Sequence, residues 1–202
     1  MEKLEFVEGE LTLKRLVDGP TFKAKCYNKY RVNGFVFSPS EYETTKSTQN
    51  NGVSMKAITK YRTSAKDKNY KEDEATYYGV VKQIIELDYT VFRQTVFYYD
   101  WVRVEDKTNG CIVDPESNLI MVNMEKLKGH EKEGDEPFIL ASQASQVLYS
   151  KDQIRLGWYV VLMSSKRLTK NMDTLEDLTL FSSSGGENTN LENIIKEFGY
   201  EL

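Results

Sequence analysis

Two adjacent runs of β-branched and aromatic residues at the centre of the chain constrain its fold more than any other feature. The first is TYYGVVKQIIELDY (76–89) and the second is TVFRQTVFYYDWVRVED (90–106). Side chains of these types favour the half-buried surface of a sheet. In the second run apolar residues occupy both alternating sets of positions, which predicts a strand covered on both faces or bent near Asp100. Gly79 is typical of a bulge or of a close approach between backbones.

Turn signals divide the rest of the chain into further short strands. Asn33-Gly34 lies between alternating apolar residues, and both residue types accept a positive φ angle, so the pair predicts a β-hairpin. Asn109-Gly110 marks another turn. Strands are expected in NLIMVNMEKL (118–127) and, as the last strand, in GWYVVLMSSK (157–166). Short strands separated by turns about every ten residues predict a mainly β fold, either a small barrel or a sandwich.

Length and composition agree with one globular domain, with or without appendages. The chain has 202 residues, of which 40% are hydrophobic and 29% charged. No apolar run approaches the ~18 residues of a membrane-spanning helix. The first ten residues, MEKLEFVEGE, have no signal-peptide pattern, so we expect an intracellular protein. Cys26 and Cys111 are far apart in the sequence, which disfavours a disulfide framework.

Charge is distributed unevenly along the chain, whose net charge is −4. Residues 11–71 contain 13 Lys or Arg and four Asp or Glu, whereas residues 171–202 contain one Lys and seven Asp or Glu. The basic part predicts either contact with nucleic acid or a solvated surface that attracts the acidic tail. Residues 60–75 have few apolar side chains and are interpreted as a basic, mobile loop. The candidate phosphate contacts in this region are Lys56, Lys60, Arg62, Lys66 and Lys68.

The last part of the chain predicts a linker followed by a short amphipathic helix. SSSGGENTN (182–190) has the composition of a flexible linker. Thr189 and Glu192 then have capping-box spacing, and Gly199 occupies a C-terminal cap position. One apolar face would be made by Leu191, Ile194, Ile195 and Phe198. Because a helix of about ten residues is marginal in isolation, this face must dock on the protein's own domain or in a partner's groove.

No pattern in the sequence predicts a catalytic, metal or cofactor site. His130 is the only histidine and lies in a charged segment, away from any cysteine. No glycine-rich phosphate-binding loop occurs, and Ser142 and Ser145 lack the context of an exposed nucleophile. Four aspartates could cluster around a metal ion, but their spacing in the sequence is not that of a known metal site. They are Asp88, Asp100, Asp106 and Asp114. We therefore expect a protein that is not an enzyme and that binds no cofactor.

Three stretches occur in the same order and at similar spacing as in a plant transposon domain. They are VNGFVFSPSEYETTKSTQNNGVSM, YYGVVKQIIELDY followed by VFYYDWVRV, and DEPFILASQASQVLYSKD followed by GWYVVL. Over residues 27–168 the chain thus resembles the domain of unknown function downstream of the transposase region in CACTA (En/Spm-type) transposon proteins. The resemblance implies a β domain at 27–168, an N-terminal extension at 1–26, and an acidic linker with the terminal helix at 169–202. It also implies a nuclear, non-catalytic interaction module, because the transposase domain of such proteins lies elsewhere.

The same pattern is distantly similar to the bromo-adjacent homology domain, a β-rich chromatin module. This likeness implies a small SH3-like barrel with long loops, in which PFILASQASQVLYS (137–150) forms a strand, a bulge or single turn, and a second strand. Ser142 and Ser145 would then bond to local backbone. The implied function is binding of a protein or of chromatin, for example of a methylated lysine in an aromatic cage. The candidate cage residues, whose alternative role is in the core, are Tyr77, Tyr78, Tyr98, Tyr99 and Trp101.

Sequence-independent nucleic-acid binding through residues 56–71 is the alternative function. Five Lys or Arg lie between Lys56 and Lys68, opposed only by Asp67. Contacts between such residues and phosphates need no particular base sequence. The acidic pI of about 5.3 counts against a dedicated nucleic-acid binder.

Overall fold

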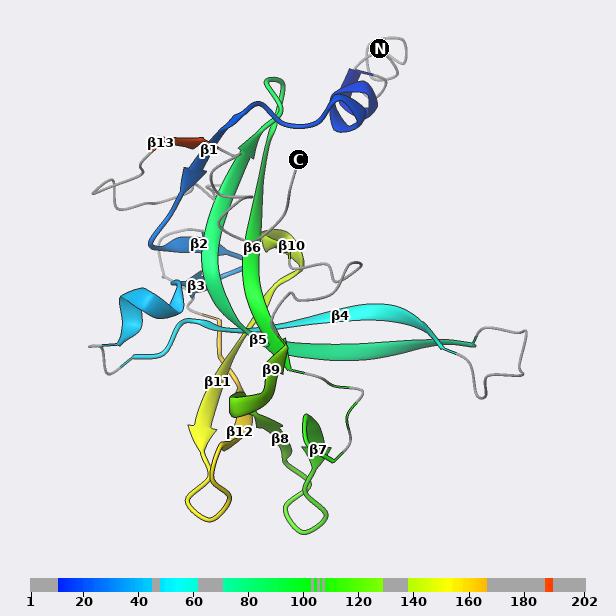
Figure 1. Ribbon diagram of the computed structural model, residues 1–202, viewed down its shortest axis with the longest axis vertical. Helices are drawn as coiled ribbons and strands as arrows, with labels where there is room; N and C mark the ends of the chain where they lie inside the picture. Colours follow the sequence, from blue (N-terminus) through cyan, green and yellow to red (C-terminus); the bar gives the residue numbers. More distant parts are fainter. Residues whose placement is uncertain are drawn as a thin grey trace.

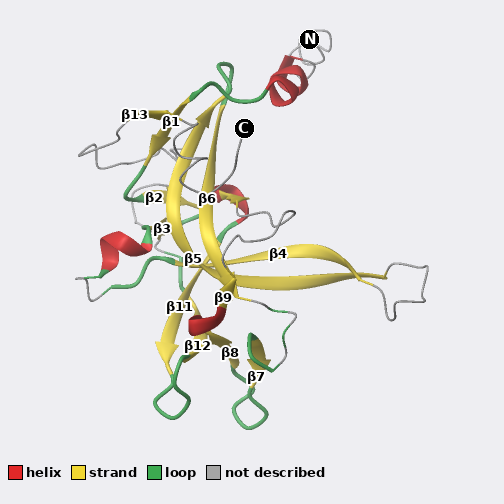
Figure 2. Cartoon of the chain, viewed as in Figure 1, coloured by secondary structure: helices red, strands yellow, loops and turns green. Residues whose placement is uncertain are grey.

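The computed structural model describes residues 11–44, 48–61, 71–102, 104, 106, 108–128, 138–166 and 188–190. The fold is mainly β, as the sequence predicts (Figure 2). In chain order the strands are β1 (Lys23–Cys26), β2 (Tyr30–Val32), β3 (Phe35–Phe37), β4 (Gly52–Tyr61), β5 (Lys71–Asp88), β6 (Arg93–Val102), β7 (Cys111–Val113), β8 (Ile120–Asn123), β9 (Leu127–Lys128), β10 (Phe138–Leu140), β11 (Ser145–Lys151), β12 (Trp158–Met163) and β13 (Asn188–Asn190). Residues 11–18 form an α-helix, and short 3₁₀ helices are η1 (Ser40–Glu43), η2 (Met124–Lys126) and η3 (Ala141–Gln143).

One large antiparallel sheet holds most of the strands and curls into a half-barrel (Figure 1). Its order is β10-β6-β5-β4-β11-β12-β8-β7, with β1 beside β5 and β13 beside β1. β9 follows β8 through η2 and pairs with the end of β6, which brings the far side of the sheet back toward its centre. The barrel-like curl agrees with the sequence prediction, while the likeness to SH3 or bromo-adjacent homology domains stays a prediction.

β5 is the longest strand and organises the sheet. Its first part pairs with β4 up to Val80, and its second part pairs with β6 from Gly79 onward. The register shifts between Val81 and Gln83, so the strand carries an irregularity of the kind that Gly79 had suggested two residues earlier. In β6, residues 95–97 are buried in succession, which confirms that this strand is covered on both faces.

The predicted Asn33-Gly34 hairpin is confirmed and packs on the sheet. Asn33 has φ 52° and Gly34 has φ 77°, as a tight turn between β2 and β3 requires. The ring of Phe37 lies 4.9 Å from that of Phe97 on β6. Both rings belong to the largest apolar cluster among the described residues, which also contains Phe35, Ile84 and Ile139. This cluster holds the hairpin against β5, β6 and β10.

A second apolar cluster lies within the curl and depends on two glycines. Tyr149 on β11 donates a hydrogen bond from its hydroxyl to the carbonyl of Gly79 (2.8 Å), and its ring passes over Gly52. A Cβ at Gly52 would lie 2.2 Å from the Val147 carbonyl, and a Cβ at Gly79 would lie 2.5 Å from the Asp100 carbonyl. Both positions therefore admit only glycine, which confirms the close backbone approach predicted at Gly79.

The segment at residues 137–150 has the predicted form. β10 is followed by the single turn η3 and then by β11. β10 pairs with β6, and β11 pairs with β4 and β12. The strands predicted within 118–127 and 157–166 are also present as β8 and β12.

The prediction of a loop over residues 60–75 is wrong where the structure describes it. Residues 60–61 belong to β4 and residues 71–75 to β5, and the two strands extend as a two-stranded arm away from the rest of the sheet (Figure 1). The physical reason is that residues of opposite charge meet across the two strands, because Lys60 lies opposite Glu72 in the register and Lys56 is ion-paired with Glu74. Residues 62–70 lie outside the described residues.

Strands also occur beyond the range predicted for the β domain. β1 pairs with residues 85–87 of β5, and β13 pairs with β1. β12 is therefore not the last strand, and residues 188–190, predicted as the end of a linker, are part of the sheet. The helix predicted after Asn190 lies outside the described residues. Within the described part of the chain, no helix has the length and apolar character needed to cross a membrane.

Candidate functional site

The structure brings three of the candidate aromatic residues together on one face of β5 and β6. The rings of Tyr77 and Trp101 are stacked, with centroids 5.0 Å apart and planes inclined by 30°. Trp101 also meets Tyr99 edge-on at 6.2 Å. Tyr99 is 2% exposed and belongs to the largest apolar cluster, whereas Tyr77 and Trp101 are half-buried. Of these three residues, Tyr77 and Trp101 are thus the two that remain partly exposed.

The other two candidate tyrosines lie elsewhere. Tyr98 follows the opposite face of β6 and packs against Phe138 on β10, with ring centroids 5.5 Å apart. Tyr78 is 6% exposed and lies inside the curl, where burial raises the pKa of its hydroxyl. An aromatic cage needs several rings around one space, so the five candidates do not together line one site.

The basic candidates lie along the arm, where acidic residues accompany them. Lys56 is ion-paired with Glu74 at 2.6 Å, and both side chains are exposed. Lys60 lies opposite Glu72 in the strand register. Arg62, Lys66 and Lys68 fall outside the described residues. Residues 56–76 contain six Lys or Arg and four Asp or Glu, so the positive charge of the arm is largely balanced.

Two hairpin turns, which a contact between Arg155 and Asp114 links, carry exposed aliphatic side chains. The β7–β8 and β11–β12 hairpins are adjacent in the sheet, and Figure 1 shows their turns at the lower end of the view. The exposed fractions are 58% for Val113, 42% for Leu119, 92% for Ile154 and 79% for Leu156. We call these four residues the tip surface. No sequence pattern predicts them as a site, although Ile154 and Leu156 stand out in the polar turn DQIRLG.

Arg155 ties the two turns together. Its guanidinium lies 3.3 Å from the Asp114 carboxylate and 3.4 Å from the Met121 sulfur. Hydrogen bonds from the Ser117 hydroxyl and backbone N–H, followed by the Arg155 charge, hold the pKa of Asp114 below its usual range. The contact between Arg155 and Asp114 thus links the two turns that carry the tip surface.

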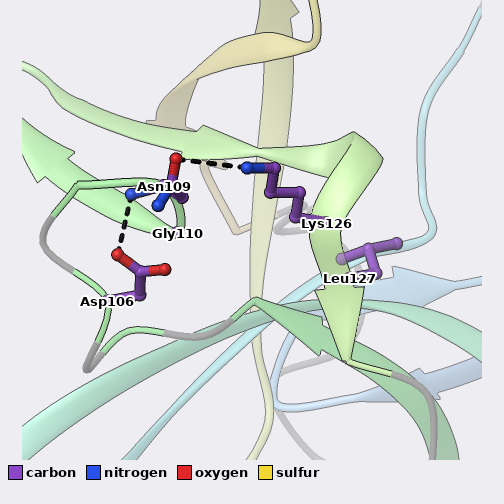
Figure 3. Close-up of a pocket in the computed structure, with 5 residues that line it drawn as sticks. All are labelled: Asp106, Asn109, Gly110, Lys126 and Leu127. Carbon is purple, nitrogen blue, oxygen red and sulfur yellow. Dashed lines mark hydrogen bonds between the residues drawn. The ribbon is translucent and has the colours of Figure 1, made fainter.

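A small polar pocket lies at the other end of β7 (Figure 3). It has a volume of about 320 Å³ and is lined by Asp106, Asn109, Gly110, Lys126 and Leu127. Asp106 accepts backbone hydrogen bonds from Thr108 and Asn109, which lower its pKa, and Lys126 donates to the Asn109 side chain at 3.1 Å. The polar groups of the pocket thus bond to one another, and its acid and base stabilise the turn.

The carboxylates considered in the sequence do not converge. Asp88 caps the turn after β5, Asp100 is ion-paired with Lys82 at 3.2 Å, and Asp106 and Asp114 hold two different turns. Among the described residues, no group of three or more His, Cys, Asp or Glu is close enough to hold a metal ion. His130 lies outside the described residues.

Comparison with known families gives one result. Residues 85–161 match the family model of a domain of unknown function, DUF4216. No curated protein and no solved structure matches the chain. The matched residues include the tip surface, the polar pocket and strands β6–β11, whereas the arm formed by β4 and the start of β5 lies before them.

Proposed function

We propose that this chain is a non-catalytic interaction module that binds a protein partner through the tip surface. The observation that carries this proposal is the exposure of four aliphatic side chains on two turns that the contact between Arg155 and Asp114 links. Single exposed aliphatic residues are ordinary, but several of them on linked turns are typical of a contact surface.

The chemistry of the tip surface defines the partner. Ile154 and Leu156 project from one turn as the most exposed members, so they fit a shallow aliphatic groove. Charged residues of both signs lie in or beside the same turns, namely Glu116, Lys151 and Asp152. A mixed rim favours a protein over a membrane of anionic lipid, which would select for Lys and Arg.

The resemblance supports a context for this module. We place it in a CACTA-type transposon protein of a plant nucleus, where the partner is a subunit of the transposition machinery or a chromatin protein. The support is the order and spacing of the motifs quoted above, together with the match of residues 85–161 to a domain of unknown function. Within this context the half-buried Tyr77–Trp101 pair is a second contact for a partner side chain.

A matched pair of variants tests the proposal. Ile154→Asp with Leu156→Asp removes the apolar character of the tip, while Ile58→Asp makes the same change at another exposed isoleucine, on the arm. The full chain, each variant and a bait-free control are cross-linked in plant nuclear extract, and captured proteins are quantified. The proposal requires a protein that is captured by wild type and Ile58→Asp and is lost with the tip variant. Equal capture by the wild type and both variants would refute the tip surface as the contact.

Nucleic-acid binding by the arm is the second candidate. Its supporting observation is shape, because a two-stranded ribbon with basic side chains fits the DNA major groove. Duplex DNA is titrated at two salt concentrations with wild type and with Lys60, Arg62, Lys66 and Lys68 changed to Ala. A contact through the arm predicts binding at low salt that the quadruple variant weakens. Absence of wild-type binding at low salt would eliminate this candidate.

A further inference from the structure

A second apolar surface lies on the sheet, on the side opposite the β2–β3 hairpin. Its buried members are Ala24, Ile85 and Val96, and its half-buried members are Cys26, Leu87, Tyr98 and Phe138. The strand registers place them on one side, because Ile85 lies opposite both Cys26 and Val96, and Phe138 lies opposite Tyr98. We call these seven residues the apolar face.

The burial of the apolar face exceeds what its own strands provide. All seven residues come from β1, β5, β6 and β10, which are neighbours in one sheet, and no side chain of another described element belongs to the cluster. Nevertheless Ile85 is 1% exposed and Ala24 is 3% exposed. Side chains on an open sheet surface retain contact with water, so a further layer covers this face.

A polar group on the same side leads to the same conclusion. Gln83 lies two residues before Ile85 on β5, so both side chains follow one side of the strand. The Gln83 side-chain oxygen is buried, and no described residue donates a hydrogen bond to it. A buried amide oxygen is costly without a donor, and a covering segment with polar side chains can supply one.

The position of β13 indicates which segment forms this layer. β13 pairs antiparallel with β1, with Asn188 opposite Lys25 and Asn190 opposite Lys23. The chain therefore passes Asn190 at the border of the apolar face. The next eight residues, LENIIKEF, carry Leu191, Ile194, Ile195 and Phe198 at helical spacing.

We propose that residues 191–198 form an amphipathic helix that covers the apolar face of the same molecule. Eight helical residues extend about 12 Å, and the four strands of the face span roughly 14 Å, so the helix can cross the face. The proposal identifies the partner of the terminal helix as β1, β5, β6 and β10, and makes the apolar face an intramolecular interface.

Cys26 provides a probe, because it is a half-buried thiol on the apolar face. In the full chain with Cys111→Ser, single cysteines replace Ile194 or Ile195 on the apolar stripe, and Asn193 or Lys196 on the opposite side of the helix. A short bismaleimide then links Cys26 to any second thiol nearby, and the products are identified by denaturing gel and peptide mass spectrometry.

The proposal predicts intramolecular links at Ile194→Cys and Ile195→Cys that form at least several-fold faster than at the two control positions. Equal rates at all four positions, or links only between molecules, would overturn it. A cysteine at Leu178 tests the other apolar stretch near β13, NMDTLEDLTLF (171–181). Faster linkage there than at residues 194 and 195 would assign the cover to that stretch and refute the proposal.

A second measurement does not depend on the engineered thiols. Ile195→Asp introduces a charge into the proposed interface, and Lys196→Asp introduces the same charge on its outer side. The rate at which a thiol reagent modifies Cys26 should rise several-fold in Ile195→Asp and stay at the wild-type value in Lys196→Asp. Unchanged rates in both variants would contradict the cover, and circular dichroism checks that both proteins remain folded.

Discussion

Gly52→Ala should destabilise the fold strongly, although it adds one methyl group. In the structure the added Cβ lies 2.2 Å from the Val147 carbonyl and 3.0 Å from the Tyr149 ring, where ordinary contact begins at 3.4 Å. The tyrosine ring is held by its hydroxyl bond to Gly79 on β5. Neither neighbour is a flexible chain end, so β4 and β11 must separate by about 1 Å.

The cost follows from what this separation breaks. Overpacking of a core site costs ~1–3 kcal/mol. β4 and β11 are in register at only two residue pairs, Ser54 with Ser145 and Val53 with Gln146, so a shift of this size also breaks at least one bond of the ladder. A lost backbone hydrogen bond adds about 1 kcal/mol. We therefore expect a loss of about 2–4 kcal/mol from a total stability of roughly 5–15 kcal/mol.

Urea unfolding followed by far-UV circular dichroism measures this loss. With a slope of about 2 kcal/mol per molar urea, the midpoint should fall by about 1–2 M at unchanged slope. Gly19→Ala is the control, since Gly19 has φ +82° and no atom within 4 Å of its added Cβ. It should cost only the left-handed backbone strain of about 1 kcal/mol. A Gly52→Ala protein as stable as the control would refute the crowding argument.

Three further predictions concern aromatic and charged groups. Trp101→Ala removes a half-buried ring that packs on Tyr77 and should cost about 2–4 kcal/mol in urea unfolding; an unchanged midpoint would show that the ring is not structural. Burial raises the pKa of Tyr149, so its contribution to stability is present below about pH 10 and lost as the pH rises further; absorbance at 295 nm should show that it ionises only with unfolding. Arg155→Gln should raise the pKa of Asp114 only in part, since Ser117 is the larger cause, and carbon-13 NMR titration of the carboxyl checks this.

The central strands could be predicted because their signal is local. Residues 76–89 and 90–106 carry side chains that favour a sheet in any context, and Asn33-Gly34 satisfies a turn that needs two positive φ angles. The two-stranded arm could not be predicted in the same way. Each of its two strands contains a charged run that, taken alone, is typical of a loop. The charges favour a sheet only when the strands pair and Lys60 lies opposite Glu72.

The edge strand β13 and the candidate sites could not be predicted from short sequence stretches, because they depend on which strands pair in the fold. β13 has the sequence NTN, in which both asparagines disfavour a strand, and its pairing with β1 sets its conformation. Tyr98 and Tyr99 are consecutive, so alternation already places them on opposite faces of a strand and argues against a common cage. The tip surface was not predicted, because it combines residues of two hairpins that are linked by the contact of Arg155 with Asp114.

The boundaries of the family match differ from those of the folded unit. Residues 85–161 contain β6–β11 but omit β4 and most of β5, to which β6 and β11 are paired. Tyr149 lies in the matched part, yet its hydroxyl partner Gly79 and the glycine beneath its ring, Gly52, lie before it. A fragment of residues 85–161 would expose the edges of β6 and β11 and lose the layer that buries Phe97. The proposed binding at the tip surface would therefore depend on strands outside the matched segment, because those strands hold the half-barrel that carries the two turns.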